Sequence, residues 1–232
     1  MIGIDGCPGG WFAVVIEGDD SPRAHLFESI EKLWGTHKNA ERILIDMPIG
    51  LADAPNHQRT CDRQARRLLG DHRSSIFTPP MRDVIGEPDF HSANRLSRTL
   101  SGKGISIQSW NIGRKIAELD HFLRTNREAI PCFRESHPEL CFMALNHMHP
   151  LSYSKKLQPG MTERLELIRR VIPSIDILYA AVLKSCTRTV VRRDDIIDAA
   201  GLAARAVWRF PMRSLPERVE CDREGLPMSI WV

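Results

Sequence analysis

Two short apolar runs that each end in an aspartate constrain the fold of this chain. Ile2–Ile4 is followed by Asp5, and Ile43–Ile45 is followed by Asp46. Turn sequences rich in Gly and Pro come next, GCPGG after the first aspartate and MPIG after the second. Apolar runs of this length, bounded by turns, are typical of strands buried on both faces. A carboxylate at the end of a buried strand costs several kcal/mol unless a cation, hydrogen-bond donors or water accompany it. The pattern therefore predicts a sheet that carries a functional acid at the end of two strands.

The remaining pattern predicts a mixed α/β chain. Short strands are expected at 2–4, 12–16 and 25–27, at 43–45, and in a run that ends at Glu135. Apolar residues at helical spacing predict helices, at 29–34, 60–69, 89–100, 112–123, from 138, and at 161–171, 174–184 and 193–208. The tail from Pro227 is expected to be extended. We predict a single domain over 1–232, with a basic, helical insertion over about 52–128 between two strands of the sheet.

Composition narrows the class of protein. The formal net charge is only +3, so any basic surface must be local. None of the six cysteines forms a CxxC pair, which argues against a zinc ribbon and fits a reducing compartment. No apolar run approaches the roughly 20 residues that a membrane span needs, and the first strand begins at Met1 without a signal peptide. We expect a cytoplasmic protein with no membrane partner.

A second group of acids lies at the start of the last predicted helix, RRDDIIDAAGLAA. Asp195 and Asp198 are three residues apart and share one helix face, next to the packed alanines. Close carboxylates repel and raise each other's pKa, and a divalent cation removes that repulsion. Oxygen ligands without paired Cys or His indicate Mg²⁺ or Mn²⁺. Asp194 has a second interpretation as a helix cap, and Asp46 as a turn cap before Pro48.

Basic residues form the predicted contact with a nucleic acid. The candidates for binding phosphate are Arg63, Arg66, Arg67, Arg73, Lys155 and Lys156. Their alternative interpretation is an ordinary solvent-exposed face. His137 is a candidate general acid, with a structural hydrogen bond as the alternative.

Motifs over almost the whole chain resemble one family. They are GIDGCPGGW, ILIDMPIGL, RTCDRQARRLLG, RSSIFTPPMR, ESHPELCF, the SKKLQPG loop, RRDDIIDAAGLAA and GLPMSIW. Together they resemble domain-of-unknown-function family 429 (DUF429), whose members are classed as predicted nucleases of the ribonuclease H fold. This resemblance implies a mixed sheet in which the first three strands are antiparallel and the later ones parallel, flanked by helices.

The resemblance also implies roles for the acids. Asp5 would be the central metal ligand, Asp46 the acid of the fourth strand, and Asp195 and Asp198 the acids of the last helix. Ribonuclease H carries a further glutamate on its first helix, in a motif that residues 29–34 lack. Glu135 is the residue predicted in its place, as part of a catalytic set of Asp5, Asp46, Glu135 and Asp198.

The expected function is metal-dependent hydrolysis of a phosphodiester in DNA or RNA, with two ions about 4 Å apart. One alternative is an actin-like phosphotransferase that binds a nucleotide at DGCPGGW, although such proteins duplicate the sheet and no second copy is evident. The other is a non-catalytic module in which arginines neutralise the acids. A nucleophilic Cys7 is a further hypothesis, for which the sequence assigns no His and acid partners.

Overall fold

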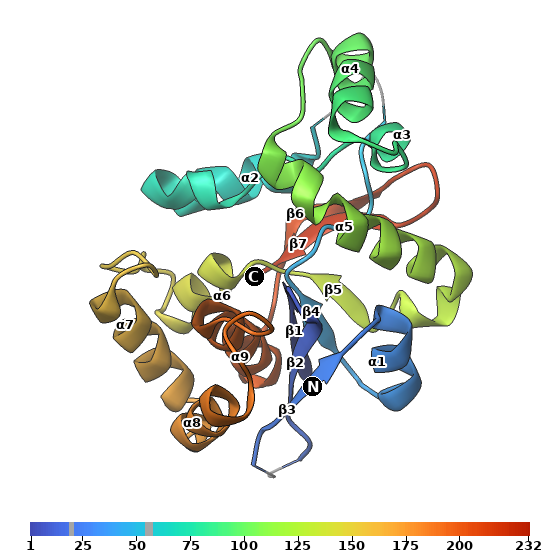
Figure 1. The fold of residues 1–232 in the computed structure, drawn as a ribbon. Coiled ribbons are helices and arrows are strands. Elements are labelled where there is room, and N and C mark those ends of the chain that lie inside the picture. The colour runs from blue at the N-terminus through green and yellow to red at the C-terminus, as the bar shows by residue number, and fades with distance from the viewer. Residues whose placement is uncertain (19–20, 54–57) are drawn as a thin grey trace. The chain divides into compact units, whose positions relative to one another are not determined.

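The computed structural model describes residues 1–18, 21–53 and 58–232. The chain forms two compact units (Figure 1). The first contains residues 1–46, 131–212 and 232, and the second contains residues 47–130 and 213–231. The predicted insertion over 52–128 lies in the second unit, together with a segment from near the C-terminus that the sequence did not associate with it.

The first unit is built on a five-stranded mixed sheet. Its strands are β1 (Ile2–Cys7), β2 (Gly10–Val15), β3 (Arg23–Phe27), β4 (Ile43–Ile45) and β5 (Phe133–Glu135), in the order β3-β2-β1-β4-β5. Strands β1, β2 and β3 pair antiparallel, while β4 pairs parallel with both β1 and β5. The prediction of an α/β chain with a mixed sheet flanked by helices is confirmed.

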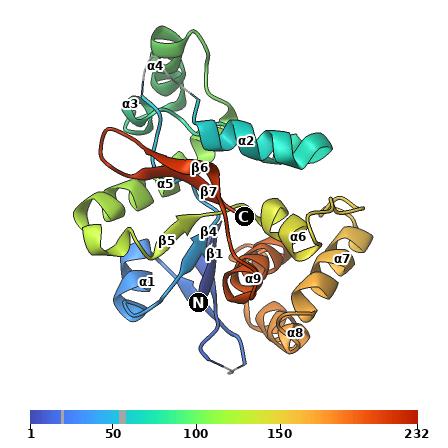
Figure 2. The same ribbon diagram turned by 180° about the vertical axis from the view of Figure 1, so that it is seen from behind.

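Helices cover both faces of this sheet. They are α1 (Ile30–Thr36), α6 (Pro138–Leu145), α7 (Gln158–Arg169), α8 (Ile175–Ser185) and α9 (Arg193–Val207). Helix α1 lies on one face, and α6 to α9 lie on the other (Figures 1 and 2). Ser29 caps α1 by accepting a hydrogen bond from the backbone N–H of Lys32. This cap and the buried Ile30, Leu33 and Trp34 explain why the predicted helix forms here.

Helix α9 packs directly against the backbone of β1. A Cβ at Gly3 would lie 2.2 Å from both the carbonyl oxygen of Ala199 and the backbone nitrogen of Ala203. No side chain fits at this distance, so the glycine and the alanines set a close approach between helix and sheet. The main core of the unit continues from this contact into α6, α7 and α8, with Phe12, Phe142 and Ile168 among its buried residues.

The second unit combines helices with a two-stranded sheet. Its elements are α2 (Thr60–Leu69), the 3₁₀ helix η1 (Gly70–Ser75), α3 (Arg82–Ile85), α4 (Phe90–Ser101), α5 (Ile107–Thr125), the 3₁₀ helix η2 (Arg127–Ala129), β6 (Ser214–Cys221) and β7 (Pro227–Trp231). The predicted extended tail is β7, and it pairs antiparallel with β6. Strand β6 was not predicted, because its sequence SLPERVEC contains a proline and little apolar alternation.

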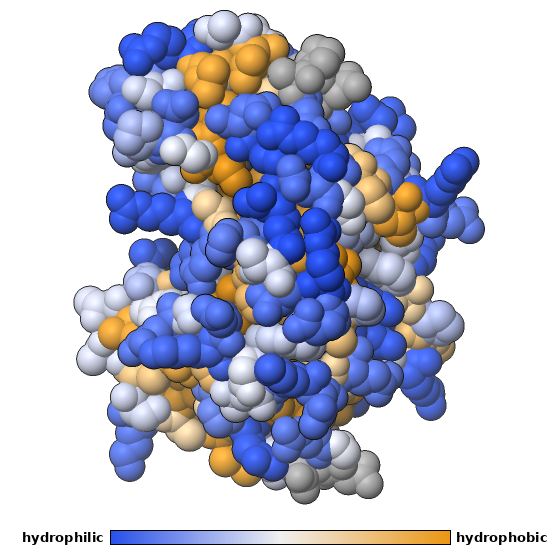
Figure 3. Space-filling model, turned by 90° about the vertical axis from the view of Figure 1, so that its right-hand side faces the viewer, coloured by the Kyte–Doolittle hydropathy of each residue, from blue (hydrophilic) through white to orange (hydrophobic). Residues whose placement is uncertain are grey.

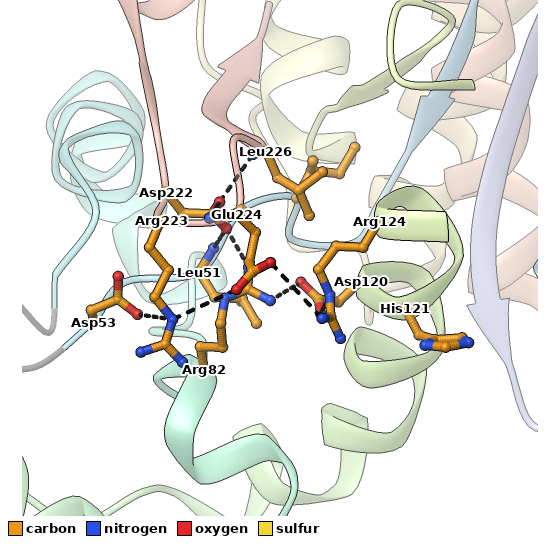
Figure 4. Close-up of polar contacts among 12 residues, drawn as sticks. Leu51, Asp53, Arg82, Asp120, His121, Arg124, Asp222, Arg223, Glu224 and Leu226 are labelled. Atoms are coloured by element: carbon orange, nitrogen blue, oxygen red, sulfur yellow. Dashed lines mark hydrogen bonds and ion pairs between the residues drawn. The ribbon is translucent and has the colours of Figure 1, made fainter. Parts of the chain in front are cut away.

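A buried arginine ties several elements of the second unit together. Arg82 in α3 forms ion pairs with Asp120 in α5 and with Asp222 in the β6–β7 turn (Figure 4). Asp222 also accepts hydrogen bonds from the backbone N–H groups of Leu51 and Leu226, each at 2.9 Å. The network gives partners to charges that would otherwise be buried alone.

Exposed apolar side chains are scattered. The face drawn in Figure 3 is mainly hydrophilic, with small apolar areas between charged and polar residues. The largest exposed apolar side chains include Ile177 in α8 and Ile107 in α5, which belong to different units. Within the described ranges, every helix is too short or too polar to cross a membrane.

Candidate functional site

The register of the sheet places Asp5 and Asp46 side by side. Ile4 in β1 is level with Ile45 in β4, and the Asp46 N–H donates to the carbonyl oxygen of Ile4 at 3.0 Å. The two aspartates therefore follow at the same level, on neighbouring parallel strands roughly 5 Å apart. Side chains alternate along a strand, so Asp5 shares the face of Gly3, against which α9 packs. As whole residues both aspartates are half-buried, while their carboxyl groups are largely removed from solvent.

Helix α9 brings the third carboxylate to the same face. Asp198 directly precedes Ala199, whose carbonyl oxygen lies at the close contact with Gly3. The Asp198 side chain is buried, with 3% of the residue exposed. Its Oδ1 atom is buried and has no hydrogen-bond partner among the described residues. A buried carboxylate oxygen is stabilised by a hydrogen-bond donor, a water molecule or a cation.

A lysine supplies positive charge to this site. Lys155, in the loop between α6 and α7, places its Nζ 2.7 Å from Oδ2 of Asp198. The lysine side chain is 39% exposed, whereas the Asp198 side chain is 4% exposed. The ammonium group therefore approaches the buried carboxylate from the solvent side.

All three carboxylates have raised pKa values. Burial raises the pKa of Asp5 well above its usual range, and the charges of Asp46 and Asp198 raise it further. Burial raises the pKa of Asp46 to about 7 and that of Asp198 to about 6, although Lys155 opposes both changes. Burial disfavours the charge of Lys155, but the three aspartates together raise the pKa of its ammonium group above the usual value. One ammonium does not balance three carboxylates, so the site favours protons or further cations.

Two residues near the site were missed by sequence reasoning. Glu139 lies in the first turn of α6 and raises the pKa of both Asp46 and Asp198. Arg164 in α7 donates to both carboxylate oxygens of Glu139, at 2.7 and 2.8 Å, and is 1% exposed. Glu139 is part of the ESHPEL motif, but its partner lies 25 residues further along the chain. Only the folded chain reveals that Arg164 is a buried cation.

Two predicted residues have structural hydrogen bonds. Asp195 Oδ2 accepts a hydrogen bond of 2.8 Å from the backbone N–H of Arg192, which caps the start of α9. His137 accepts at Nδ1 from the backbone N–H of Glu139, at 3.2 Å, and so caps α6. Asp195 still contributes to the raised pKa of Asp5, which places it near the site.

Glu135 is not brought together with the other predicted acids. It is level with Ile45 in the register of β4 and β5, one residue before the level of Asp46. Because side chains alternate, Glu135 leaves the opposite face of the sheet from Asp46. Phe133 shares that opposite face and lies against Trp34 of α1, with ring centroids 5.9 Å apart. The residue predicted in place of the ribonuclease H glutamate is therefore buried on the α1 side.

A comparison with protein families relates the chain to known sequences. The family model described as "Protein of unknown function (DUF429)" matches residues 3–220. The chain belongs to this family. The match spans both units of the DUF429 protein and includes Asp5, Asp46 and Asp198. No curated protein and no solved structure matches the chain.

The basic residues predicted to bind phosphate differ in their surroundings. In the DUF429 protein, Arg63, Arg67 and Arg73 lie exposed in the second unit, and Lys156 is exposed in the first. Arg66 donates from Nε to the carbonyl oxygen of Ile76 at 3.0 Å and from Nη2 to Thr78 at 2.8 Å. Arg66 thus holds the segment after η1 against α2, while Lys155 faces the carboxylates.

The carboxylates of this DUF429 site have the chemistry of a hard-cation site. Asp5, Asp46 and Asp198 carry carboxylate oxygens, and no donor in the described part of the chain reaches Asp198 Oδ1. Among residues 1–18, 21–53 and 58–232, however, no three His, Cys, Asp or Glu side chains are yet arranged as a ligand shell. Lys155 forms an ion pair with Asp198. Asp5, Asp46 and Asp198 could serve as oxygen ligands of a divalent ion only after movement of their side chains.

Proposed function

We propose that this DUF429 protein is a divalent-metal-dependent nuclease with a ribonuclease H-like fold, which hydrolyses phosphodiesters of DNA or RNA. One observation carries the proposal. Asp5, Asp46 and Asp198 come from three separate elements to one face of the sheet, and the buried Oδ1 of Asp198 has no donor among the described residues.

The topology supports the fold assignment. Three antiparallel strands are followed by parallel β4 and β5, in the order β3-β2-β1-β4-β5. The first acid, Asp5, lies within the central strand β1. The second acid, Asp46, directly follows β4, and the third, Asp198, lies in the late helix α9. This is the order of acids implied by the resemblance to the ribonuclease H fold.

The acids and the basic residues would have different roles in the reaction. Asp5, Asp46 and Asp198 would hold Mg²⁺ or Mn²⁺, and such an ion supplies a Lewis acid and lowers the pKa of bound water. Glu139, held by Arg164, adds negative charge behind Asp46 and Asp198 and so favours a cation there. Lys156, which is exposed in the same unit as the three acids, would contact the phosphate backbone.

Cleavage assays with paired variants test this proposal. Purified protein is incubated with single-stranded and double-stranded DNA, RNA and branched junctions, in millimolar Mg²⁺ or Mn²⁺. We expect cleavage that EDTA abolishes. The double variant Asp5→Asn/Asp198→Asn should lose at least about 100-fold in rate, since a metal ion contributes several kcal/mol to such reactions.

Asp194→Asn is the matched control, because Asp194 is an exposed acid on the same helix. It should cleave at the wild-type rate. Cleavage that survives in Asp5→Asn/Asp198→Asn at the rate of the control would refute the proposed site.

A non-catalytic binding module is the second candidate, and the Lys155–Asp198 ion pair favours it. In that case the lysine neutralises the acid permanently, and no divalent ion binds at millimolar concentration. Absence of cleavage on all substrates, together with absence of metal binding, would select this candidate.

A further inference from the structure

The loop that carries Lys155 is fixed close to the lysine. Glu163 in α7 accepts hydrogen bonds from the backbone N–H groups of Ser152 and Tyr153, at 2.8 and 3.1 Å. Arg164 donates to the carbonyl oxygen of Tyr153 at 3.2 Å, and it is itself held by Glu139. The backbone two residues before Lys155 is therefore anchored by the half-buried Glu163 and by the buried Arg164.

A glycine in α7 brings the loop close to the helix. A Cβ at Gly160 would lie 2.1 Å from the carbonyl oxygen of Ser154, the residue before Lys155. Only glycine permits this approach. The fold thus fixes the position of the Lys155 backbone. The Lys155 side chain is 39% exposed, so it can move into solvent.

The ammonium group and a divalent ion would share one carboxylate, because Lys155 bonds Oδ2 of Asp198 and the ion would bind the neighbouring Oδ1. The charge of Lys155 lowers the pKa of both Asp46 and Asp198. An ion bound by these aspartates would lie within a few ångströms of Nζ, where like charges repel strongly in a partly buried site. An ion on Oδ1 of Asp198 would therefore weaken the ion pair that Lys155 makes with Oδ2 of the same carboxylate.

We propose that Lys155 is a displaceable internal cation, which holds the buried Asp198 carboxylate in the metal-free protein and leaves it when a divalent ion binds. This inference rests on the proposed metal site, and it concerns the affinity of that site. Lysine is suited to the role because its ammonium is a point charge on a flexible stem, which can move without disturbing the anchored backbone.

Calorimetric titration of Mn²⁺ into the metal-free full chain tests the proposal. Lys155→Gln should bind Mn²⁺ about tenfold more tightly than the wild type, because the competitor is removed and Asp198 lacks its ion pair. Lys156→Gln, the matched control at the exposed neighbouring lysine, should bind like the wild type. Lys155→Arg retains the positive charge and should bind no more tightly than the wild type. Equal or weaker binding by Lys155→Gln would overturn the proposal.

Amine labelling of the wild type provides a second measurement that needs no variant. An acetylating reagent followed by mass spectrometry reports how fast Lys155 reacts relative to Lys156. Saturating Mn²⁺ should raise the relative labelling of Lys155 severalfold, and unchanged labelling would contradict displacement. If the wild type and Lys155→Gln both fail to bind Mn²⁺ at millimolar concentration, the proposed function fails. If both bind equally, only the role of Lys155 fails.

Discussion

Replacing Arg82 with methionine is expected to lower the free energy of unfolding by about 3–5 kcal/mol, the range for removing one partner of a buried ion pair. Arg82 lies between Asp120 and Asp222, whose side chains are 5% and 0% exposed (Figure 4). Its removal leaves two carboxylates in the interior without their common cation. Urea denaturation followed by circular dichroism measures the loss.

Arg223→Met is the matched control in the same network. Arg223 pairs with Asp53 at 3.3 Å and with Asp83 at 2.8 Å, but its side chain is 47% exposed. Exposed ion pairs contribute about 0–1 kcal/mol, so this variant should stay close to the wild type. If both variants lose a similar amount of unfolding free energy, burial of the Arg82 network does not determine how much that network stabilises the protein.

Replacing Asp46 with asparagine should stabilise the metal-free protein at pH 8 while removing cleavage activity. The pKa of Asp46 is raised from 3.8 to about 7 in the folded chain. Between these pH values the folded state holds a proton that the unfolded state has lost, so stability falls as pH rises. Asparagine resembles the protonated carboxyl group but does not titrate, so the variant keeps its stability as the pH rises. We expect a gain on the order of 2–4 kcal/mol at pH 8 and little gain near pH 4.5, after allowance for partial exposure.

Urea denaturation in EDTA at several pH values measures this effect. Asp194→Asn is the control, since Asp194 is exposed in the first turn of α9. The difference in the free energy of unfolding between Asp46→Asn and the wild type should grow as the pH rises. A difference that stays constant with pH would show that titration of Asp46 does not cause the gain in stability. A gain in stability on loss of activity is expected where carboxylates are held together for function.

The sequence predicted those features that depend on local pattern. The repeated unit of apolar run, acid and turn identified β1 and β4 and both of their aspartates. Helical periodicity beside alanines predicted that Asp198 lies on a helix that packs closely on the sheet, and the contact of Ala199 with Gly3 confirms this placement. These inferences need only the periods of a strand and a helix.

The remaining features depend on registers and long-range contacts. Glu135 was chosen because it ends a strand, but only the pairing of β4 with β5 shows that its side chain leaves the other face. The Lys155–Asp198 pair joins residues 43 positions apart, through a loop with no periodic pattern. Strand β6 has few apolar residues, since it pairs within a two-stranded sheet. A single sequence does not encode these contacts in any local signal.

The close approach at Gly3 has a consequence for recognising this site in other chains. Gly3 offers no functional group, yet any larger residue would push α9 away from β1 and carry Asp198 away from Asp5 and Asp46. The site is therefore specified by four positions, three acids and a glycine two residues before the first of them. A homologue that keeps every acid but replaces this glycine would need a different spacing between helix and sheet. Its three carboxylates would then lie further apart than Asp5, Asp46 and Asp198 do here.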